Sequence, residues 1–464
     1  MNDASLAAEP SSFRDPSGCV FYADGCVFRA VFPAAAHRFE KVMQSGVLKA
    51  MMAQGRMVDC TVLPASDPVY QRFGQNVSYV LAHTRLETIT YPYEWSFLML
   101  QAAALAHLDL QLALLEKGYG LSDASAFNMQ FVGAHPLHID TLSVIPYQDN
   151  SYWAGYRQFL EHFLNPLLLE SATGVSFAPW FRSSMDGLPS EDLVRLLPWH
   201  QRLYPAVFMH VVLPAWGERR SGNGQVQTPP AISKTRHLGM LNHLRNLTAS
   251  LKPRIPKSGW HHYSETHPYA AASQAMKQQL VAEFAARNRP RLLLDIGCNT
   301  GHYAQLALEH GAASVVGLDS DRASIDAAFL RSKAHNLSYL PLVMDIINPS
   351  PSQGWQLTER SALWQRVRPD SLLALAVLHH LCIGHNLPLA SATQHLVSLA
   401  PRGLIEFIPK KDPKVQDMLA LREDHFQDYT LEAAREALTR HATLVKETPL
   451  GDSHRVLFEF VRAV

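Results

Sequence analysis

Residues 291–319 read RLLLDIGCNTGHYAQLALEHGAASVVGLD, and this stretch decides the fold of the C-terminal half. An apolar run at 292–294 ends in Asp295, and a second run, SVVGL at 314–318, ends in Asp319. Between the runs lie a turn of small residues and a helical pattern that continues to about residue 310. This order predicts a strand–turn–helix–strand unit of a doubly wound α/β sheet, with a carboxylate at the tip of each strand.

The turn between the first strand and the helix is suited to a ligand that carries a ribose. Its glycines let the backbone approach a ligand closely, and an acidic residue about 20 positions further on can bind the ribose hydroxyls. A dinucleotide fingerprint requires a second glycine, G-x-G-x-x-G, where this chain has Asn299. NAD and FAD are therefore disfavoured. The alternative to a ligand site is a strand–helix–strand unit that binds no ligand.

The sequence D-x-G-x-N-T-G resembles motif I of the class I S-adenosylmethionine (SAM) methyltransferases. The resemblance implies SAM as cofactor, bound at the carboxyl ends of the strands. It assigns the methionine end of SAM to the motif I residues Asp295, Gly297, Cys298, Asn299 and Gly301. It assigns the ribose to Asp319 and Ser320, the adenine to Asp345 and Ile346, and the floor beneath the sulfonium to the segment that begins at Ala374.

Candidate catalytic residues follow the next predicted strand, in AVLHHLCIGHNLP at 376–388. Histidine is the natural general base near neutral pH, so His379, His380 or His385 could deprotonate the methyl acceptor. The alternative is that the histidine pair only shapes the pocket. Glu406 lies amid apolar residues of a further strand, which is costly unless the carboxylate pairs, with the substrate or with a histidine.

The C-terminal domain, residues 255–464, is expected to be a Rossmann-like α/β domain. Further strands are predicted at 338–344, 371–377, 403–408, 442–447 and 455–462, and the short loop between the last two makes one strand antiparallel. The resemblance implies the seven-stranded class I methyltransferase sheet. The pieces HHL-x-I-G-x-N-x-P, EF-x-PK-x-DP-x-VQ and RED-x-F-x-DYT resemble a bacterial family of SAM-dependent methyltransferases with nodulation-type members.

The segment WHHYSETHPY at 260–269 precedes the first helix of this domain. In many class I methyltransferases this region covers SAM or the substrate, which makes His261 and Tyr263 candidates for a lid. An aromatic packing segment is the alternative.

The N-terminal half, residues 1–215, is expected to form an α+β domain. Strands are predicted at 26–32, 57–63 and 77–82, and helices at 37–54, 95–117, 151–169 and 190–196. Asp123 and Asn128 have the D-x-x-x-x-N spacing of a kinase catalytic loop, and Asp140 follows in an apolar strand; this resembles the C-lobe of aminoglycoside-phosphotransferase-like kinases. No glycine-rich nucleotide loop, H-R-D or V-A-I-K is present, so a degenerate kinase-like domain or an unrelated recognition or dimerisation domain is expected.

Residues 216–254 are predicted to be a linker followed by a basic helix. The stretch 216–230 is rich in Gly, Ser, Asn, Gln and Pro, and no acidic residue occurs between Glu218 and Glu265. The basic tract could dock an anionic partner such as RNA, or it could pack on acidic neighbours, and the second interpretation is favoured.

Length and composition limit the number of domains, the kinds of partner and the cellular compartment. At 464 residues the chain is expected to hold two or three domains, and 41 basic residues balance 41 acidic ones, so nucleic acid is an unlikely partner. The sequence contains no run of 18 apolar residues and no signal-peptide pattern, so no membrane segment is expected. Five scattered cysteines without C-x-x-C predict a reducing cytoplasm and no metal site.

The function expected from these features is transfer of the SAM methyl group to O, N or C of a small or carrier-bound metabolite, in bacterial secondary metabolism. The N-terminal half would present the substrate or form a homodimer. Two alternatives stay open: an RNA methyltransferase, and a non-enzymatic SAM-binding scaffold with a pseudokinase-like half.

Overall fold

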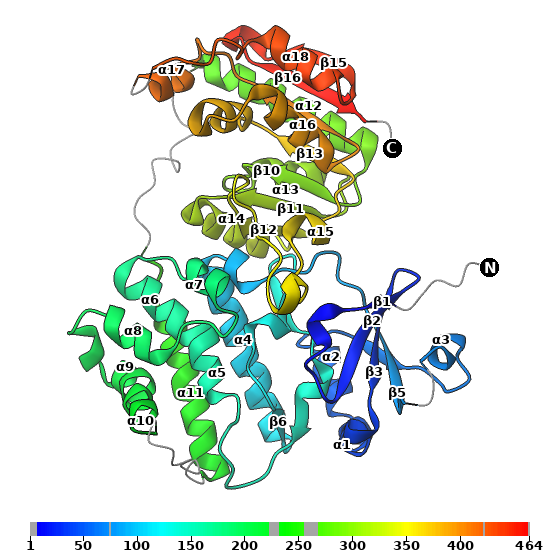
Figure 1. Cartoon of the computed structure of the whole chain (residues 1–464), viewed down its shortest axis with the longest axis vertical. Helices are drawn as coiled ribbons and strands as arrows, with labels where there is room; N and C mark the ends of the chain where they lie inside the picture. The colour runs from blue at the N-terminus through cyan, green and yellow to red at the C-terminus, as the bar shows by residue number, and fades with distance from the viewer. Residues whose placement is uncertain (1–6, 74–75, 222–231, 255–267, 421–422, 463–464) are drawn as a thin grey trace. The chain divides into compact units, whose positions relative to one another are not determined.

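The computed structural model describes residues 7–73, 76–221, 232–254, 268–420 and 423–462. The chain forms two compact units (Figure 1). Unit 1 comprises Met1–Pro256 together with Pro351–Ala362, and unit 2 comprises Lys257–Ser350 and Leu363–Val464. The boundary at 256 lies close to the one drawn from the sequence, but the sequence had assigned residues 351–362 to the C-terminal domain.

Unit 2 contains a mixed sheet whose described strands number seven, in the order β12-β11-β10-β13-β14-β16-β15. The strands are β10 (Leu293–Ile296), β11 (Val315–Asp319), β12 (Tyr339–Val343), β13 (Ser371–Ala374), β14 (Arg402–Phe407), β15 (Thr443–Pro449) and β16 (Val456–Val461). Strands β10 to β14 are parallel, and β16 runs antiparallel between β14 and β15. The described sheet is therefore an α/β sheet of the kind that the methyltransferase resemblance implies.

Helices bury the parallel strands of unit 2. They are α12 (Pro268–Asn288), α13 (His302–Glu309), α14 (Arg322–Ala334), α15 (Leu363–Arg366), α16 (Leu389–Leu399), α17 (Pro413–Leu419) and α18 (Leu431–Thr439). Residues of α12, α13 and α14 share one apolar core with alternate strand residues such as Leu293, Leu373 and Leu404. Every residue of β10 and β13 is buried, as expected for parallel strands that are covered on both faces.

Strand β13 ends at Ala374, three residues earlier than predicted. Ala376 has a φ of 54°, in the left-handed region, which turns the backbone out of the strand direction. The chain then enters a π-helical turn at His380–Gly384. Because the strand ends early, the histidine pair lies in the turn that follows the strand.

Unit 1 begins with an antiparallel sheet in the order β1-β2-β3-β5-β4, followed by two strand pairs, β6 with β9 and β7 with β8. The strands are β1 (Ala7–Ala8), β2 (Gly18–Ala23), β3 (Cys26–Val31), β4 (Cys60–Val62), β5 (Tyr79–His83), β6 (Tyr119–Leu121), β7 (Met129–Val132), β8 (His135–His138) and β9 (Val144–Pro146). Strand β2 was not predicted from the sequence, whereas β3 and β5 lie close to their predicted positions.

Helices make up the rest of unit 1. They are α1 (Pro33–Gln44), α2 (Val47–Ala53), α3 (Pro68–Gln71), α4 (Phe97–Glu116), α5 (Tyr156–Phe159), α6 (Asn165–Thr173), α7 (Ala178–Ser183), α8 (Ser190–Leu196), α9 (Pro205–Val207), α10 (Leu213–Ser221) and α11 (Lys234–Ser250). The single helix predicted at 37–54 is broken at Gly46, whose φ of 72° no continuous helix allows. Helix α10 continues to Ser221, so the first part of the predicted linker is helical.

Helix α4 is the central element of the helical part of unit 1. Of the described helices, it is the one long and apolar enough to cross a membrane, but 56% of its apolar window is buried within the protein. It packs against α11, α6, β6 and β8. Its apolar composition is accounted for by this core position.

Candidate functional site

The carboxylate of Asp319, at the tip of β11, organises the turn that follows β10. Its Oδ2 accepts a hydrogen bond from the backbone amide of Asn299 at 2.9 Å, and its Oδ1 accepts one from the amide of Asp321 at 2.9 Å. Gly297 and Gly301 have φ angles of 71° and 79°, and Asn299 has a φ of 47°. The turn and the tip of β11 thus form one rigid edge, with backbone conformations that favour glycine and asparagine.

Asp295 lies beneath this turn as a buried carboxyl group. Only 2% of the residue is exposed, and its Oδ2 has no hydrogen-bond partner among the described residues. Burial, and next the nearby charge of Asp319, raises the pKa of the Asp295 carboxyl to about 8. An orphaned acid of this kind is costly in the fold and is typical of a functional site.

Tyr339 of β12 supports the turn from behind, and sequence reasoning missed it. A Cβ atom on Gly301 would lie 2.5 Å from the Tyr339 ring, and one on Gly317 would lie 2.5 Å from its hydroxyl. Both positions must therefore be glycine for the ring to fit. Cys298, predicted to contact SAM, is 5% exposed and lies beside the same ring.

The remaining predicted cofactor residues lie at the same edge of the sheet, but with different exposure. Ala374 is buried at the end of β13, and Ser320 is exposed directly after β11. Asp345 is exposed two residues after β12, where its Oδ1 accepts a hydrogen bond from the amide of Ile347 at 3.0 Å. Ile346, between them, is half-buried. Carboxyl ends of neighbouring parallel strands bring these residues to one edge.

His379 is fully buried, and neither of its ring nitrogens has a hydrogen-bond partner among the described residues. Burial, and next the neighbouring His380, lowers the pKa of the His379 imidazole to about 3. The two rings lie 4.1 Å apart, centroid to centroid. Burial also lowers the pKa of His380, which is half-buried. His379 is therefore neutral near pH 7 and can accept a hydrogen bond without retaining a proton.

Glu406 is paired with two cationic side chains, Lys277 and Arg455, where the sequence had pointed to the substrate or a histidine. It is 0% exposed, and its Oε2 accepts a hydrogen bond from Lys277 Nζ of α12 at 2.7 Å. The guanidinium of Arg455 lies 3.7 Å from its Oε1 and also donates to Asp412 at 2.8 Å. The sequence pattern pointed to Glu406, but nothing in it indicated Lys277 as the partner.

Three further candidates were named from the sequence. His261 and Tyr263 lie outside the described residues. His385 is exposed, although its charge contributes to lowering the pKa of His380. Within the described ranges, no group of three or more His, Cys, Asp or Glu side chains could hold a metal ion.

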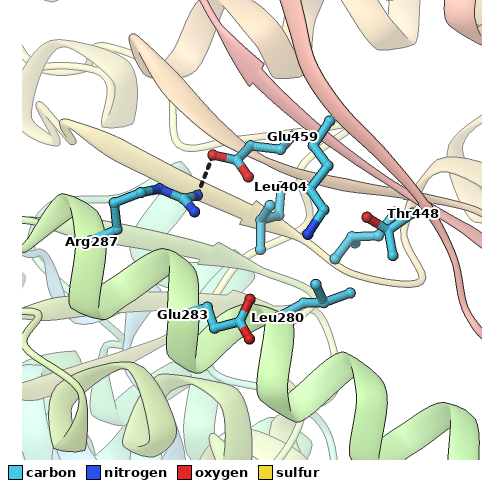
Figure 2. A pocket seen from close by; sticks show the side chains of 8 residues that line it. Leu280, Glu283, Arg287, Leu404, Thr448 and Glu459 are labelled. Atoms are coloured by element: carbon cyan, nitrogen blue, oxygen red, sulfur yellow. Dashed lines mark hydrogen bonds and ion pairs between the residues drawn. The ribbon is translucent and has the colours of Figure 1, made fainter.

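Described residues of unit 2 line a small cavity and an open groove. The first lies between α12 and strands β14 to β16, is lined by residues such as Leu280, Glu283 and Leu404, and holds about 10 Å³ (Figure 2). This is room for about one water molecule, and the Arg287–Glu459 ion pair lies beside it.

The second cavity is an open groove of about 570 Å³. Its lining residues are Asn386, Leu387, Pro388, Glu423, His425, Phe426 and Asp428. It brings together two sequence pieces that the methyltransferase resemblance singled out, the one that follows the histidine pair and the one at 422–430.

In unit 1, the three kinase-like residues do come together. Asn128 donates a hydrogen bond to Asp123 at 2.9 Å, and burial followed by the charge of Asp140 raises the pKa of the Asp123 carboxyl to about 7. Asp140 is paired with Arg29 of β3 at 3.0 Å, and Arg29 also pairs with Asp15. A guanidinium thus lies against the Asp140 carboxylate, to which the sequence resemblance would assign magnesium.

Comparison with known proteins gives one full-length relative. The chain is 43% identical over 459 residues to nodulation protein NoeA of Rhizobium meliloti (strain 1021). The aligned region covers 97% of this chain and 95% of that protein. No protein-family model matches the chain.

Two solved structures each match less than half of the chain. N-methyltransferase NodS from Bradyrhizobium japonicum WM9, in complex with S-adenosylhomocysteine, is 14% identical and covers 45% of this chain and 94% of its own, with a TM-score of 0.33. Magnesium protoporphyrin IX methyltransferase from Synechocystis PCC 6803 is 18% identical and covers 44% and 88%, with a TM-score of 0.31. Likenesses at these TM-scores carry no argument about activity.

The pKa of Asp295 generates a prediction about pH. The folded protein holds a proton on Asp295 up to about pH 8, whereas the unfolded chain releases it near pH 4, so stability falls as the pH rises between these values. Between pH 5 and 8 the free energy of unfolding should therefore decrease by roughly 3 kcal/mol less in Asp295→Asn than in the unmodified protein. Thermal unfolding followed by circular dichroism over this range measures it. Asp417→Asn, at an exposed site, is the control, and an unchanged pH profile in Asp295→Asn would contradict the assignment.

The Arg29 cluster generates a prediction about stability. Arg29→Met leaves two partly buried carboxylates without their cation, and should lower the free energy of unfolding by about 3 kcal/mol. Trp95 and Trp153 are buried in unit 1, so tryptophan fluorescence during urea unfolding reports this change. Arg440→Met breaks an exposed pair with Glu436 and should cost less than about 1 kcal/mol. An equal decrease in the free energy of unfolding in both variants would show that the Arg29 pairs stabilise the fold no more than an exposed ion pair does.

Proposed function

This chain belongs to the family of the nodulation protein NoeA, and from the geometry of its site we propose that it is a SAM-dependent methyltransferase. Its substrate is a small or carrier-bound metabolite of bacterial secondary metabolism, methylated on O, N or C. The observation that carries the proposal is the turn after β10, held by the Asp319 carboxylate at the carboxyl edge of the sheet. Ligands of open α/β sheets bind at this edge.

The residues at this edge fit SAM. Gly297 and Gly301 bring bare backbone to the surface of the turn, where the methionine part would lie. An ionised carboxylate offers about four acceptor positions, so Asp319 can hold two backbone amides and still accept the ribose hydroxyls. The unpartnered Oδ2 of Asp295 can accept from the ammonium of the cofactor. SAM, when bound, supplies an electrophilic methyl group on a sulfonium.

The acceptor side is built by His379 and His380. Methyl transfer is an in-line displacement that depends on alignment. The unprotonated ring nitrogen of neutral His379 can accept a hydrogen bond from the hydroxyl or amine of the acceptor and hold its lone pair in line. A group with a pKa of about 3 does not retain the acceptor's proton near pH 7, so His379 acts by position, and the proton passes to His380 or to water.

Glu406 stabilises this side without acting on the substrate. Its carboxylate is committed to Lys277 and lies near Arg455, which ties β14 to α12 and to Asp412 at the start of α17. A buried ion network of this kind fixes the geometry around a site. The open groove lined by Asn386, Phe426 and Asp428 offers a path for the acceptor.

Unit 1 serves as a recognition or dimerisation domain with a degenerate kinase-like cluster. Arg29 supplies the positive charge next to Asp140 that a bound metal supplies in a kinase. The basic tract also favours internal packing over RNA binding. Arg245 pairs with Asp109 of α4, and Arg254 donates to the carbonyl of Ala172 at 2.9 Å.

The cofactor assignment predicts the effect of Asp319→Ala. The change removes both the acceptor for the ribose and the two backbone contacts of the turn, and should weaken binding of S-adenosylhomocysteine by at least about 100-fold. Isothermal titration calorimetry measures it. Asp370→Asn is the matched control, because Asp370 precedes β13 at the opposite edge of the sheet, where it accepts from the amide of Arg291. Unchanged affinity in Asp319→Ala would refute the placement of the cofactor, and absence of binding by the unmodified protein would refute the methyltransferase assignment itself.

The acceptor assignment predicts a separation of binding from turnover. His379→Ala should leave affinity for S-adenosylhomocysteine unchanged and lower methyl transfer roughly 10- to 100-fold. His379→Gln, which keeps a hydrogen-bond acceptor, should recover part of the rate without altering its pH profile from pH 6 to 8, because His379 does not titrate there. The readout is transfer of labelled methyl from SAM to small-molecule extracts of the producing bacterium. Loss of cofactor binding in His379→Ala would assign the residue to the cofactor pocket.

A further inference from the structure

Seven large apolar side chains between residues 196 and 216 are exposed, and they gather on unit 1. They are Leu196 (43% exposed), Trp199 (72%), Leu203 (66%), Tyr204 (56%), Met209 (51%), Leu213 (45%) and Trp216 (49%), and together we call them the apolar surface. The other exposed large apolar residues of the described chain are scattered. Single exposed apolar residues need no explanation, but a concentration that includes two tryptophans does.

The apolar surface is formed by elements that pack on one another. Helix α8, the turn Gln201–Leu203, helix α9, the π-helical turn Phe208–Val212 and helix α10 are in mutual contact, and Figure 1 shows α8, α9 and α10 together at one end of unit 1. Met209, Leu213 and Trp216 are spaced four and three residues apart, which places them on one face of a helix. The Trp216 ring also lies edge-on to Phe208, with centroids 5.6 Å apart.

The helix that spans residues 205–217 is apolar on two faces. Val207, Val211 and Val212 bury one face in unit 1, while Met209, Leu213 and Trp216 leave the other uncovered. A helix that is apolar all round is normally covered on all sides. A second partner is therefore needed for the outer face.

Charge indicates what kind of partner fits. Arg202 is the one Lys, Arg, Asp or Glu in residues 196–217, and its guanidinium donates to the backbone carbonyl of Leu197 at 2.8 Å. At the rim, Arg195 is already paired with Glu191 and Asp192. Among the described side chains of residues 196–217 there is therefore no cluster of cations that would attract anionic lipid or nucleic acid. Its complement is another apolar surface.

We propose that the apolar surface is the interface at which two copies of this chain form a symmetric dimer. If a fully exposed side chain of this size presents roughly 200 Å², the exposed fractions amount to roughly 800 Å², the area that each partner buries in a standard interface. A patch whose one charged residue, Arg202, already donates to the carbonyl of Leu197 can face a copy of itself, as two-fold pairing requires, with the same apolar residues on both sides. This inference stands independently of the methyltransferase assignment.

The test is the oligomeric state of the full chain. Sedimentation velocity at micromolar concentration should give a dimer, and Leu203→Glu or Leu213→Glu should raise its dissociation constant at least about 30-fold, because a carboxylate would be buried without a partner. Trp355→Glu is the matched control, since Trp355 is 61% exposed, lies in unit 1 and is outside the apolar surface. It should leave the dimer intact.

Several outcomes would overturn the proposal. They are a monomeric unmodified protein, a dimer that survives both Glu substitutions, or a monomer that co-sediments with phosphatidylcholine–phosphatidylglycerol vesicles. Far-UV circular dichroism and the affinity for S-adenosylhomocysteine should be unchanged in both Glu variants. If Leu203→Glu proves misfolded, Trp199→Ala, which removes the most exposed ring of the surface without adding charge, should still weaken the dimer.

Discussion

The hydrogen bonds from the Asp319 carboxylate to the amides of Asn299 and Asp321 are the contacts on which the rest of the site depends. They fasten the turn after β10 to the tip of β11, so two strands present their ends as one edge. The positive φ angles of Gly297 and Gly301, the buried Asp295 and the Tyr339 ring behind the turn all follow from this arrangement. Removing the carboxylate would release the turn and the ligand position together.

Each unit contains buried acidic groups that are paired with cations and one that is not. In unit 2, Glu406 is matched by Lys277 and Arg455, while Asp295 stays unmatched and its pKa rises to about 8. In unit 1, Arg29 matches Asp15 and Asp140. A buried charge that is paired with an opposite charge holds the groups around it in one geometry. A buried acidic group without a partner raises the free energy of the fold, and a ligand that pairs with it can lower that free energy. Unit 1 also holds such an acid, because burial raises the pKa of the Asp123 carboxyl to about 7. The chemistry is placed in unit 2 because Asp295 lies next to the carboxyl edge of an open α/β sheet, where ligands bind.

Local sequence pattern predicted most elements of unit 2, because parallel strands are continuous apolar runs that end at acidic or glycine-rich turns. It failed where a single backbone conformation or a distant contact decides the outcome. The end of β13 depends on the backbone of Ala376, the break of the helix predicted at 37–54 depends on Gly46, and residues 351–362 belong to unit 1 through contacts such as that of Ser361 with Tyr91. None of these is visible in hydrophobic periodicity.

The sequence by itself determined the order of the elements, the acidic residues at the strand tips and the histidine pair, because each is set by neighbours along the chain. Only the tertiary structure decided which charges meet, since Lys277 and Glu406 lie far apart in sequence and are joined at 2.7 Å by the packing of α12 on β14. The tertiary structure also decided which face of the helix at 205–217 is buried in unit 1, because hydrophobic periodicity cannot distinguish between two apolar faces of one helix.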